Sequence, residues 1–327
     1  MSKSTLETGN PVVLIEDLTK FYNDDVKALD ALNMSIRSNS IYALLGPNGA
    51  GKTTTLSVLT TLTKPSKGRA QILGFDVVSE ATQVRNRIGV TFQETVLDGD
   101  LTGKQALDFN ARLHGLDRET RAKRISNLLN LVELTEAADR KISTYSGGMK
   151  RRLELARGLV TEPEILFLDE PTLGLDPQSR AGIWRYIRDL RDQQGMTILL
   201  TTHYLEEAQE LADTVGIIDS GKLIIEGTPD ELIAEMGADV IHLSGEGDPG
   251  SLVSTLEKKP FVKTVNTSDS LIQIGVDSAS QRIVQILNMV QEVQFRVTDV
   301  SMSRPSLDDV FLKYTGTEYR DEQEVAA

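Results

Sequence analysis

The hydrophobic positions of this chain follow two patterns that alternate along most of its length. Largely apolar runs at Ile41–Leu45, Ile165–Leu168 and Met196–Thr201 are typical of strands buried on both faces of a parallel sheet. From residue 101 to about 141 the spacing becomes helical, with an apolar stripe at i, i+3, i+4 and i+7. The stripe consists of Ile125, Leu128, Leu129 and Val132. These patterns predict an α/β core with a helical subdomain inserted into it.

Shorter patterned segments surround this core. A helix is expected at Lys52–Leu62, because the residue before Pro65 avoids the helical region and ends the helix there. The segments Val215–Asp219 and Leu223–Glu226 flank a Ser-Gly turn and are expected to form a hairpin. Further short strand-like segments are Val12–Ile15, Leu29–Ile36, Gln71–Phe75 and Ile88–Phe92.

The pattern after Gly237 predicts a second, smaller domain. Its expected order is strand, helix, strand, strand, helix, strand, at Val240–Leu243, Leu252–Glu257, Val262–Val265, Leu271–Val276, Gln281–Val290 and Phe295–Met302. This order fits a two-layer α+β unit with ferredoxin-like connectivity. We place the domains at residues 1–237 and 238–316, and expect residues 317–327 to be a disordered acidic tail. His242 lies in an apolar strand and is expected to be structural.

Composition narrows the possible functions. The chain has 327 residues, 39% of them hydrophobic and 25% charged, as in ordinary globular proteins. A net charge of −13 argues against a general nucleic-acid binder and against loose adhesion to an anionic membrane. Cysteine is absent, so disulfides and thiolate metal sites are excluded. No signal peptide and no apolar run of about 20 residues is visible, so we expect any membrane-spanning part to be another chain.

A glycine-rich stretch follows the first apolar run directly and precedes a predicted helix. It reads Gly46, Pro47, Asn48, Gly49, Ala50, Gly51, Lys52, Thr53, Thr54. Strand, loop and helix in this order are the context of a phosphate-binding loop. The glycines let backbone N–H groups converge on one point, at which the helix also aims its positive end. We therefore predict a nucleoside-triphosphate site, with Lys52 on the β- and γ-phosphates and Thr53 on Mg²⁺.

Two residues outside this loop are candidates for the same nucleotide. Tyr22 lies shortly before the loop in sequence, where its ring is suited to stacking on a purine base. Packing on a sheet edge is an equally good explanation for Tyr22, and Phe21 competes for the stacking role. Gln93 follows the strand-like segment Ile88–Phe92, where its side-chain carbonyl would reach both Mg²⁺ and the attacking water.

Ser146, Gly147 and Gly148 begin another predicted helix. Ser146 suits the N-cap position, and the buried stripe of the helix consists of Met149, Leu153, Ala156 and Val160. Paired glycines are poor helix formers, and the basic residues 150–152 stand where the helix dipole disfavours positive charge. An anion bound by the N–H groups and the Ser146 hydroxyl would explain both features. A simple helix-start turn is the alternative.

Three further polar features follow predicted strands or begin a helix. Asp169 and Glu170 end the apolar strand that begins at Ile165, at the edge where open parallel sheets bind ligands. Asp169 suits Mg²⁺, and Glu170 suits the orientation and deprotonation of the attacking water. Asp176 precedes Pro177 and is expected to cap a helix. His203 follows another strand and would hydrogen-bond the γ-phosphate.

Together these motifs resemble those of the ATP-binding-cassette (ABC) ATPases, from Val12 to about Met236. The resemblance implies a RecA-like P-loop core with antiparallel β and helical subdomains, ATP and Mg²⁺ as ligands, and ATP hydrolysis as the activity. It assigns adenine stacking to Tyr22 and the Q-loop to Gln93. The remaining assignments are Walker A for Gly46–Thr53, the signature for Tyr145–Met149, Walker B for Asp169 and Glu170, the D-loop for Asp176, and the switch histidine for His203.

Three stretches look like the daunorubicin-resistance type within this family. They are Leu173–Pro177, Thr201–Ala208 and Arg304–Gly316. The resemblance implies an ATPase subunit of an ABC-2-type exporter at the cytoplasmic face of the membrane, paired with a separate multi-span permease, with drug, antibiotic or lipid-like cargo. It also implies that two copies meet head to tail, each ATP lying between the Walker A loop of one and Ser146 of the other.

Two other functions remain open at this stage. One is a soluble ABC ATPase acting on ribosomes or nucleic acid, which would usually carry two cassettes or a long coiled-coil insertion. The other is a nucleotide-sensing regulator, for which losses at Glu170 or His203 would be expected. The chain has one cassette, no sustained heptads and both of these residues.

Overall fold

The computed structural model describes residues 11–22, 26–94, 96–237, 239–246, 249–268, 271–293 and 295–316. The chain divides into two compact units. The first holds the chain up to His203 together with Glu210–Leu223, and the second holds Tyr204–Gln209 and the chain from Ile224 onward. The domain boundary at residues 237–238 stays a prediction. The expected disordered tail, residues 317–327, lies outside the described residues.

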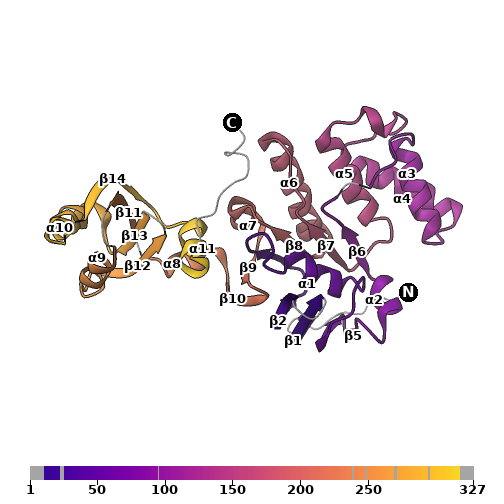
Figure 1. Ribbon diagram of the computed structural model, residues 1–327. Coiled ribbons are helices and arrows are strands. Elements are labelled where there is room, and N and C mark those ends of the chain that lie inside the picture. The colour runs from indigo at the N-terminus through magenta and orange to yellow at the C-terminus, as the bar shows by residue number, and fades with distance from the viewer. Residues whose placement is uncertain are drawn as a thin grey trace. The chain divides into compact units, whose positions relative to one another are not determined.

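A six-stranded sheet in the order β10-β9-β3-β8-β7-β6 forms the centre of the fold (Figure 1). Its pairs β3–β8, β3–β9, β6–β7 and β7–β8 are parallel. Every residue of β3, β7 and β8 is buried, as their apolar runs predict. The strands are β3 (Ile41–Leu45), β6 (Ile88–Thr91), β7 (Ile165–Asp169), β8 (Thr197–Thr202), β9 (Thr214–Asp219) and β10 (Lys222–Gly227).

A second sheet, antiparallel and in the order β2-β1-β4-β5, packs on the first through helix α1 (Lys52–Leu59). One core cluster joins Val13 of β1, Leu56 of α1 and Phe167 of β7, so α1 lies between the two sheets (Figure 1). The strands are β1 (Pro11–Tyr22), β2 (Val26–Arg37), β4 (Lys67–Ile72) and β5 (Phe75–Asp76).

The predicted helical subdomain is present between β6 and β7. Its apolar stripe is buried, with each of the four side chains less than a tenth exposed. Ser146 caps α5, in which Leu153 and Ala156 are buried and Met149 is partly buried; Val160 of the expected stripe is also buried, but it lies just beyond the end of the helix. The helices of the first unit besides α1 are α2 (Ala81–Arg85), α3 (Gly103–Leu113), α4 (Arg118–Leu131), α5 (Gly147–Gly158), α6 (Pro177–Gln194) and the short 3₁₀ helix at Ile142–Thr144. Helix α7 (Leu205–Leu211) spans the division between the units.

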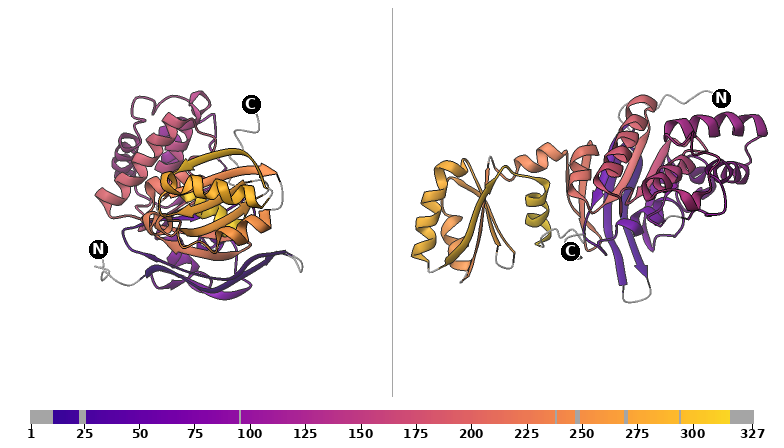
Figure 2. Two further views of the ribbon diagram at one scale, coloured as in Figure 1. Left: turned by 90° about the vertical axis from the view of Figure 1, so that its left-hand side faces the viewer. Right: turned by 90° about the horizontal axis from the view of Figure 1, so that it is seen from above.

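The second unit has the ferredoxin-like connectivity predicted for it. Its antiparallel sheet runs β12-β13-β11-β14, and α9 and α10 cover one face while α11 covers the other (Figure 2). The core between the sheet and α9 and α10 includes Leu243, Leu252, Ile274 and Ile286. The elements are α8 (Pro229–Ala234), β11 (Asp239–Glu246), α9 (Pro249–Leu256), β12 (Val262–Ser268), β13 (Leu271–Val276), α10 (Ala279–Glu292), β14 (Arg296–Ser303) and α11 (Leu307–Thr315).

Among the residues that the structure describes, no helix is both long enough and apolar enough to span a membrane.

Candidate nucleotide-binding site

The strand register brings the predicted site residues to one edge of the central sheet. Leu45 of β3 pairs with Thr202 of β8, and Asp169 of β7 pairs with Thr201. Thr91, the last residue of β6, pairs with Leu168 of β7. Because these strands are parallel, the loops that follow β3, β6, β7 and β8 all leave the sheet at the same edge.

Glycine is required at two positions of the phosphate-loop segment. A Cβ atom at Gly46 would lie 2.3 Å from the Ile218 carbonyl oxygen. Gly51 has a φ of 110°, and a Cβ atom there would lie 2.7 Å from the Ala28 carbonyl oxygen. Gly51 stands at the N-cap of α1 and makes no side-chain cap hydrogen bond, so the first N–H groups of this helix are suited to an anion. The loop therefore has the form of an anion cradle.

Lys52 is buried within this cradle. Its Nζ donates to the carbonyl oxygens of Gly46 at 2.6 Å and Pro47 at 3.3 Å, and lies 3.5 Å from Glu170 Oε1. Burial lowers the pKa of Lys52, and the negative charge of Glu170 acts in the opposite direction. The ammonium group is thus held between the loop and Glu170, which follows β7.

Asp169 and Thr53 offer two oxygen ligands side by side. Thr53 Oγ1 lies 3.4 Å from Asp169 Oδ1, and the Thr201 hydroxyl donates to the same carboxylate oxygen at 2.6 Å. Burial raises the pKa of Asp169, while the hydrogen bond from Thr201 lowers it. Two oxygens bound next to each other on one Mg²⁺ at about 2.1 Å lie about 3 Å apart, so this donor pair fits a magnesium ion.

Glu170 and His203 form a hydrogen-bonded pair. His203 Nδ1 lies 2.5 Å from Glu170 Oε2, and the His203 backbone N–H donates to the same oxygen at 3.3 Å. Burial acts to raise the pKa of Glu170, but the hydrogen bond from His203 and the charges of His203 and Lys52 outweigh it and hold the pKa below its usual value. Glu170 is therefore an ionised carboxylate directed toward the loop.

The backbone of Glu170 is also unusual. Its φ is 49°, in the left-handed region that non-glycine residues rarely adopt. Holding a residue there costs about 1–3 kcal/mol, and such strain gathers at functional sites. The surrounding contacts must therefore stabilise this turn.

Two predicted residues lie at the ends of their strands with exposed side chains. Tyr22, the last residue of β1, is 42% exposed, and the Lys20 ammonium lies 5.1 Å from the centre of its ring. Phe21 has Lys27 at 5.8 Å in the same way. Gln93 follows β6 at the loop edge and is exposed. Stacking by Tyr22 or Phe21 and metal binding by Gln93 stay predictions.

The signature segment lies against the start of α6. Ser146 accepts a hydrogen bond from the Met149 N–H at 3.2 Å, and a Cβ atom at Gly148 would come within 2.8 Å of Ser179 Oγ. Asp176 caps α6 by accepting from the N–H of Ser179 at 3.0 Å and from its hydroxyl at 2.6 Å. Gly148 thus permits the close approach of the first turns of α5 and α6. Ser146 and Asp176, which cap these two helices, therefore lie near each other.

The charge argument for an anion at this helix start does not hold for two of the three basic residues. Arg151 is buried and donates to backbone carbonyls, and Arg152 lies 3.3 Å from Glu133 Oε2 and from the Val132 carbonyl oxygen. Protein partners therefore account for both positive charges. The Ser146 hydroxyl and the N–H groups at the start of α5 still support the predicted anion site.

Sequence reasoning missed the roles of Thr201 and Arg151. Thr201 lies inside an apolar strand, where its hydroxyl gave no signal before the register placed it beside Asp169. Arg151 was one of three consecutive basic residues, and only its burial sets it apart from its neighbours.

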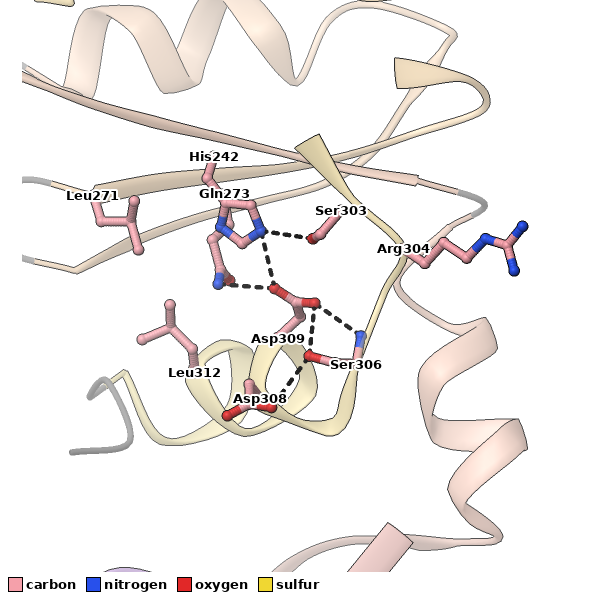
Figure 3. A pocket seen from close by; sticks show the side chains of 9 residues that line it. All are labelled: His242, Leu271, Gln273, Ser303, Arg304, Ser306, Asp308, Asp309 and Leu312. Atoms are coloured by element: carbon pink, nitrogen blue, oxygen red, sulfur yellow. Dashed lines mark hydrogen bonds and ion pairs between the residues drawn. The ribbon is translucent and has the colours of Figure 1, made fainter. Parts of the chain in front are cut away.

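A second polar cluster lies in the C-terminal unit, beside a cavity of about 310 Å³ (Figure 3). Gln273 Nε2 donates to Asp309 Oδ1 at 3.0 Å, and His242 Nε2 lies 2.9 Å from Ser303 Oγ and 3.6 Å from the same Asp309 oxygen. The Ser306 N–H donates to Asp309 Oδ2 at 2.8 Å, which completes a capping box at the start of α11. These contacts tie α11 to the sheet, so His242 has the structural surroundings expected for it.

Both parts of this chain are similar in sequence to known protein families. Residues 29–173 match the ABC transporter family, and residues 227–315 match the C-terminal domain of ATP-binding proteins of the DrrA1-3-like group. The daunorubicin resistance ATP-binding protein DrrA3 of Streptomyces coeruleorubidus is 43% identical over 314 residues, which is 95% of this chain and 98% of that protein. The Nod factor export ATP-binding protein I of Ralstonia nicotianae is 40% identical over 96% of each chain.

A solved structure matches the first part of the chain. It is the dimeric post-hydrolysis state of the ATP-binding cassette MJ0796 bound to ADP and Pi, with a TM-score of 0.60 and 27% identity. The similarity covers 66% of this chain and 98% of the cassette. The fold that surrounds the loop edge is therefore that of a nucleotide-binding cassette.

Proposed function

Because the chain belongs to the DrrA type of ATP-binding subunits of ABC transporters, we propose that it hydrolyses ATP at the edge formed by Lys52, Asp169 and Glu170. Proteins of this type are ATPases whose activity is coupled to export. The observation that carries the assignment of residues is the convergence of an anion cradle, a buried lysine, two carboxylates and a histidine at one sheet edge.

Each residue has a distinct role in this proposal. The N–H groups from Gly46 to Thr54 and the Lys52 ammonium bind the β- and γ-phosphates. The ionised carboxylate of Glu170 orients a water molecule for attack on the γ-phosphate and accepts its proton. His203 holds the Glu170 carboxylate through the 2.5 Å contact of its Nδ1, and its Nε2 would bond the γ-phosphate.

Thr53 and Asp169, with the Gln93 amide oxygen, are the residues that would hold Mg²⁺. A magnesium ion there supplies positive charge that stabilises the charge developing on the phosphates. Thr201 holds the Asp169 carboxylate in place, since its hydroxyl donates to Oδ1.

We further propose that two copies bind ATP between them. The start of α5 offers the N–H groups of residues 146–148 and the Ser146 hydroxyl, and it lies beside the start of α6, which Asp176 caps. Lys52 contacts the phosphate loop and Glu170 instead. The start of α5 therefore offers groups for an anion without a lysine of its own. A second copy, turned head to tail, would complete each site with its signature segment. The dimeric state of the similar cassette MJ0796 supports this arrangement.

ATP hydrolysis by the purified chain tests the site. We expect Lys52→Ala to lower kcat by at least about 100-fold, because the γ-phosphate then loses its main side-chain cation. Arg152→Ala is the matched control, since its guanidinium contacts only the helical subdomain and Tyr186 among the contacts described, and it should retain most of the activity. Undiminished turnover in Lys52→Ala would show that the loop is not the site.

The proposal includes a separate multi-span permease at the cytoplasmic face of the membrane. Relatives named for daunorubicin and doxorubicin resistance and for Nod factor export support an export role with drug, antibiotic or lipid-like cargo. Phe109 and Leu113 stand one turn apart on α3 and are 60% and 69% exposed, and exposed apolar pairs of this kind are suited to a protein partner.

A pull-down of the tagged chain from detergent-solubilised membranes tests the partner. We expect a multi-span membrane protein in near-equal amount, and less of it with Phe109→Ser combined with Leu113→Ser. A matched variant with Arg112→Ser, whose exposed side chain lies on the same helix, should capture the partner normally. Recovery of ribosomes or nucleic acid in place of a membrane protein would favour the soluble alternative and reject the exporter assignment.

A further inference from the structure

Arg151 of α5 is a buried cation whose guanidinium bridges two segments of backbone, residues 169–171 and Phe92. Its Nε donates to the Pro171 carbonyl oxygen at 2.6 Å, and its Nη2 donates to those of Asp169 at 2.9 Å and Glu170 at 2.8 Å. Its Nη1 donates to the Phe92 carbonyl oxygen at 2.8 Å. One guanidinium thus binds four carbonyls: that of Asp169 at the end of β7, those of Glu170 and Pro171 after it, and that of Phe92 after β6.

Both of these segments carry site residues. The carbonyls of residues 169–171 span the left-handed turn at Glu170, so the contacts restrain a backbone conformation that non-glycine residues rarely adopt. The Phe92 carbonyl directly precedes Gln93 in the chain. The planar fork of an arginine can serve several acceptors in fixed directions, which a lysine ammonium cannot do.

Glu154 extends the bridge by one more contact to the segment after β6. Its side chain is 1% exposed, its Oε2 lies 3.4 Å from Arg151 Nη1, and its Oε1 accepts from the Val96 N–H at 3.1 Å. Arg157 lies 3.5 Å from the same Oε1 and donates to the Val96 carbonyl oxygen at 2.7 Å. Glu154 therefore lies next to the buried charge of Arg151 and also binds the backbone at Val96, three residues after Gln93.

We infer that Arg151 is a positioning residue for ATP hydrolysis, which links the signature helix α5 to the Glu170 turn and to the segment carrying Gln93. It sets the direction of the Glu170 carboxylate and does not touch the nucleotide. The inference rests on the proposed role of Glu170.

Steady-state ATP hydrolysis and equilibrium binding of Mg-ATP, measured on the full chain, test this role. We expect Arg151→Lys to lower kcat by about 10–100-fold, since small misplacements of a reacting group cost about that much. KM and the Kd for Mg-ATP should stay within about twofold of wild type, because the loop and Lys52 are unaffected. Arg152→Lys is the matched control on the next residue of the same helix and should retain wild-type kcat.

Chemical rescue separates positioning from a general loss of structure. Guanidinium ion at millimolar concentration should restore part of kcat to Arg151→Ala, by refilling the buried position, and should restore none to Glu170→Gln. Wild-type kcat in Arg151→Lys, or a parallel loss of Mg-ATP binding with no rescue of Arg151→Ala, would overturn the inference. Full turnover in Glu170→Gln would instead reject the proposed function itself, so the two failures are distinguishable.

Discussion

Glu170 combines an uncommon backbone conformation with a carboxylate whose ionised form is stabilised by its neighbours. The residue adopts a left-handed turn, and its side chain is buried between Lys52 and His203. Burial alone would raise its pKa, yet the hydrogen bond from His203 and the electrostatic effect of His203 and Lys52 lower it. A proton acceptor that stays ionised while it is buried suits the activation of water.

This lowered pKa predicts how stability changes with pH. A carboxyl group whose pKa is lower in the folded state stabilises that state above its unfolded-state value of 4.5, and the effect disappears as the pH falls through the folded-state value. The free energy of unfolding of wild type should therefore exceed that of Glu170→Gln at pH 6 to 7, with a gap that narrows below about pH 4.5. Trp184, the single tryptophan, is buried in α6 and reports this unfolding by fluorescence. A gap that stays constant or widens at low pH would contradict the assignment.

Residue types with a local motif could be predicted from the sequence, whereas residues defined only by register or burial could not. Asp169 ends a strand, and Lys52 and His203 come after strands, so the sequence already predicted that they lie at one edge of the sheet. Thr201 and Arg151 act on the backbone or side chains of distant segments, at positions where a threonine in a strand and an arginine in a helix are ordinary. Their contacts depend on the packing of β7, β8 and α5, which a pattern does not contain.

The ends of β1 and α1 differ from those expected from the sequence pattern. The strand expected at Val12–Ile15 continues to Tyr22, because the irregularity around Asp17, with a φ of 46°, is a bulge inside β1 and not its end. The helix expected to reach Leu62 ends at Leu59, and Thr61 adopts a φ of 64°. The break therefore precedes the proline that was expected to end the helix.

Helix α11 is anchored by its first turn, which supports a prediction at the scale of one element. Asp309 is 2% exposed and accepts from Gln273, from the Ser306 N–H and from the Ser306 hydroxyl. Asp309→Ala should destabilise the C-terminal unit by about 2 kcal/mol, because it leaves buried donors unpaired. Hydrogen exchange in α11 should accelerate, while the Trp184 unfolding transition stays unchanged.

The neighbouring Asp308 supplies a matched control for that prediction. Its side chain is exposed and accepts from the Ser306 hydroxyl at 3.3 Å. Asp308→Ala should therefore alter exchange in α11 much less than Asp309→Ala does. Equal effects of the two substitutions would show that the buried contacts of Asp309 do not anchor the helix.

At the scale of the whole molecule, the connectivity of the second unit could be predicted from the sequence, whereas the boundary at residues 237–238 stays a prediction. The ferredoxin-like order of the second unit followed from alternating patterns alone, and the structure confirms it. The point where one unit ends depends on which residues pack together, and Tyr204–Gln209 groups with the second unit although it lies within the first along the chain. A single boundary along the sequence cannot describe a unit that is built from two separate stretches of the chain.

The central claim is that each ATP lies between the phosphate loop of one copy and the signature segment of another. The most direct test is light scattering of Glu170→Gln with Mg-ATP, in which hydrolysis is blocked and a closed pair should persist. We predict a dimer that requires Mg-ATP, and a monomer when Ser146→Arg is added to Glu170→Gln. Glu170→Gln that binds Mg-ATP yet stays monomeric at high protein concentration would contradict the account.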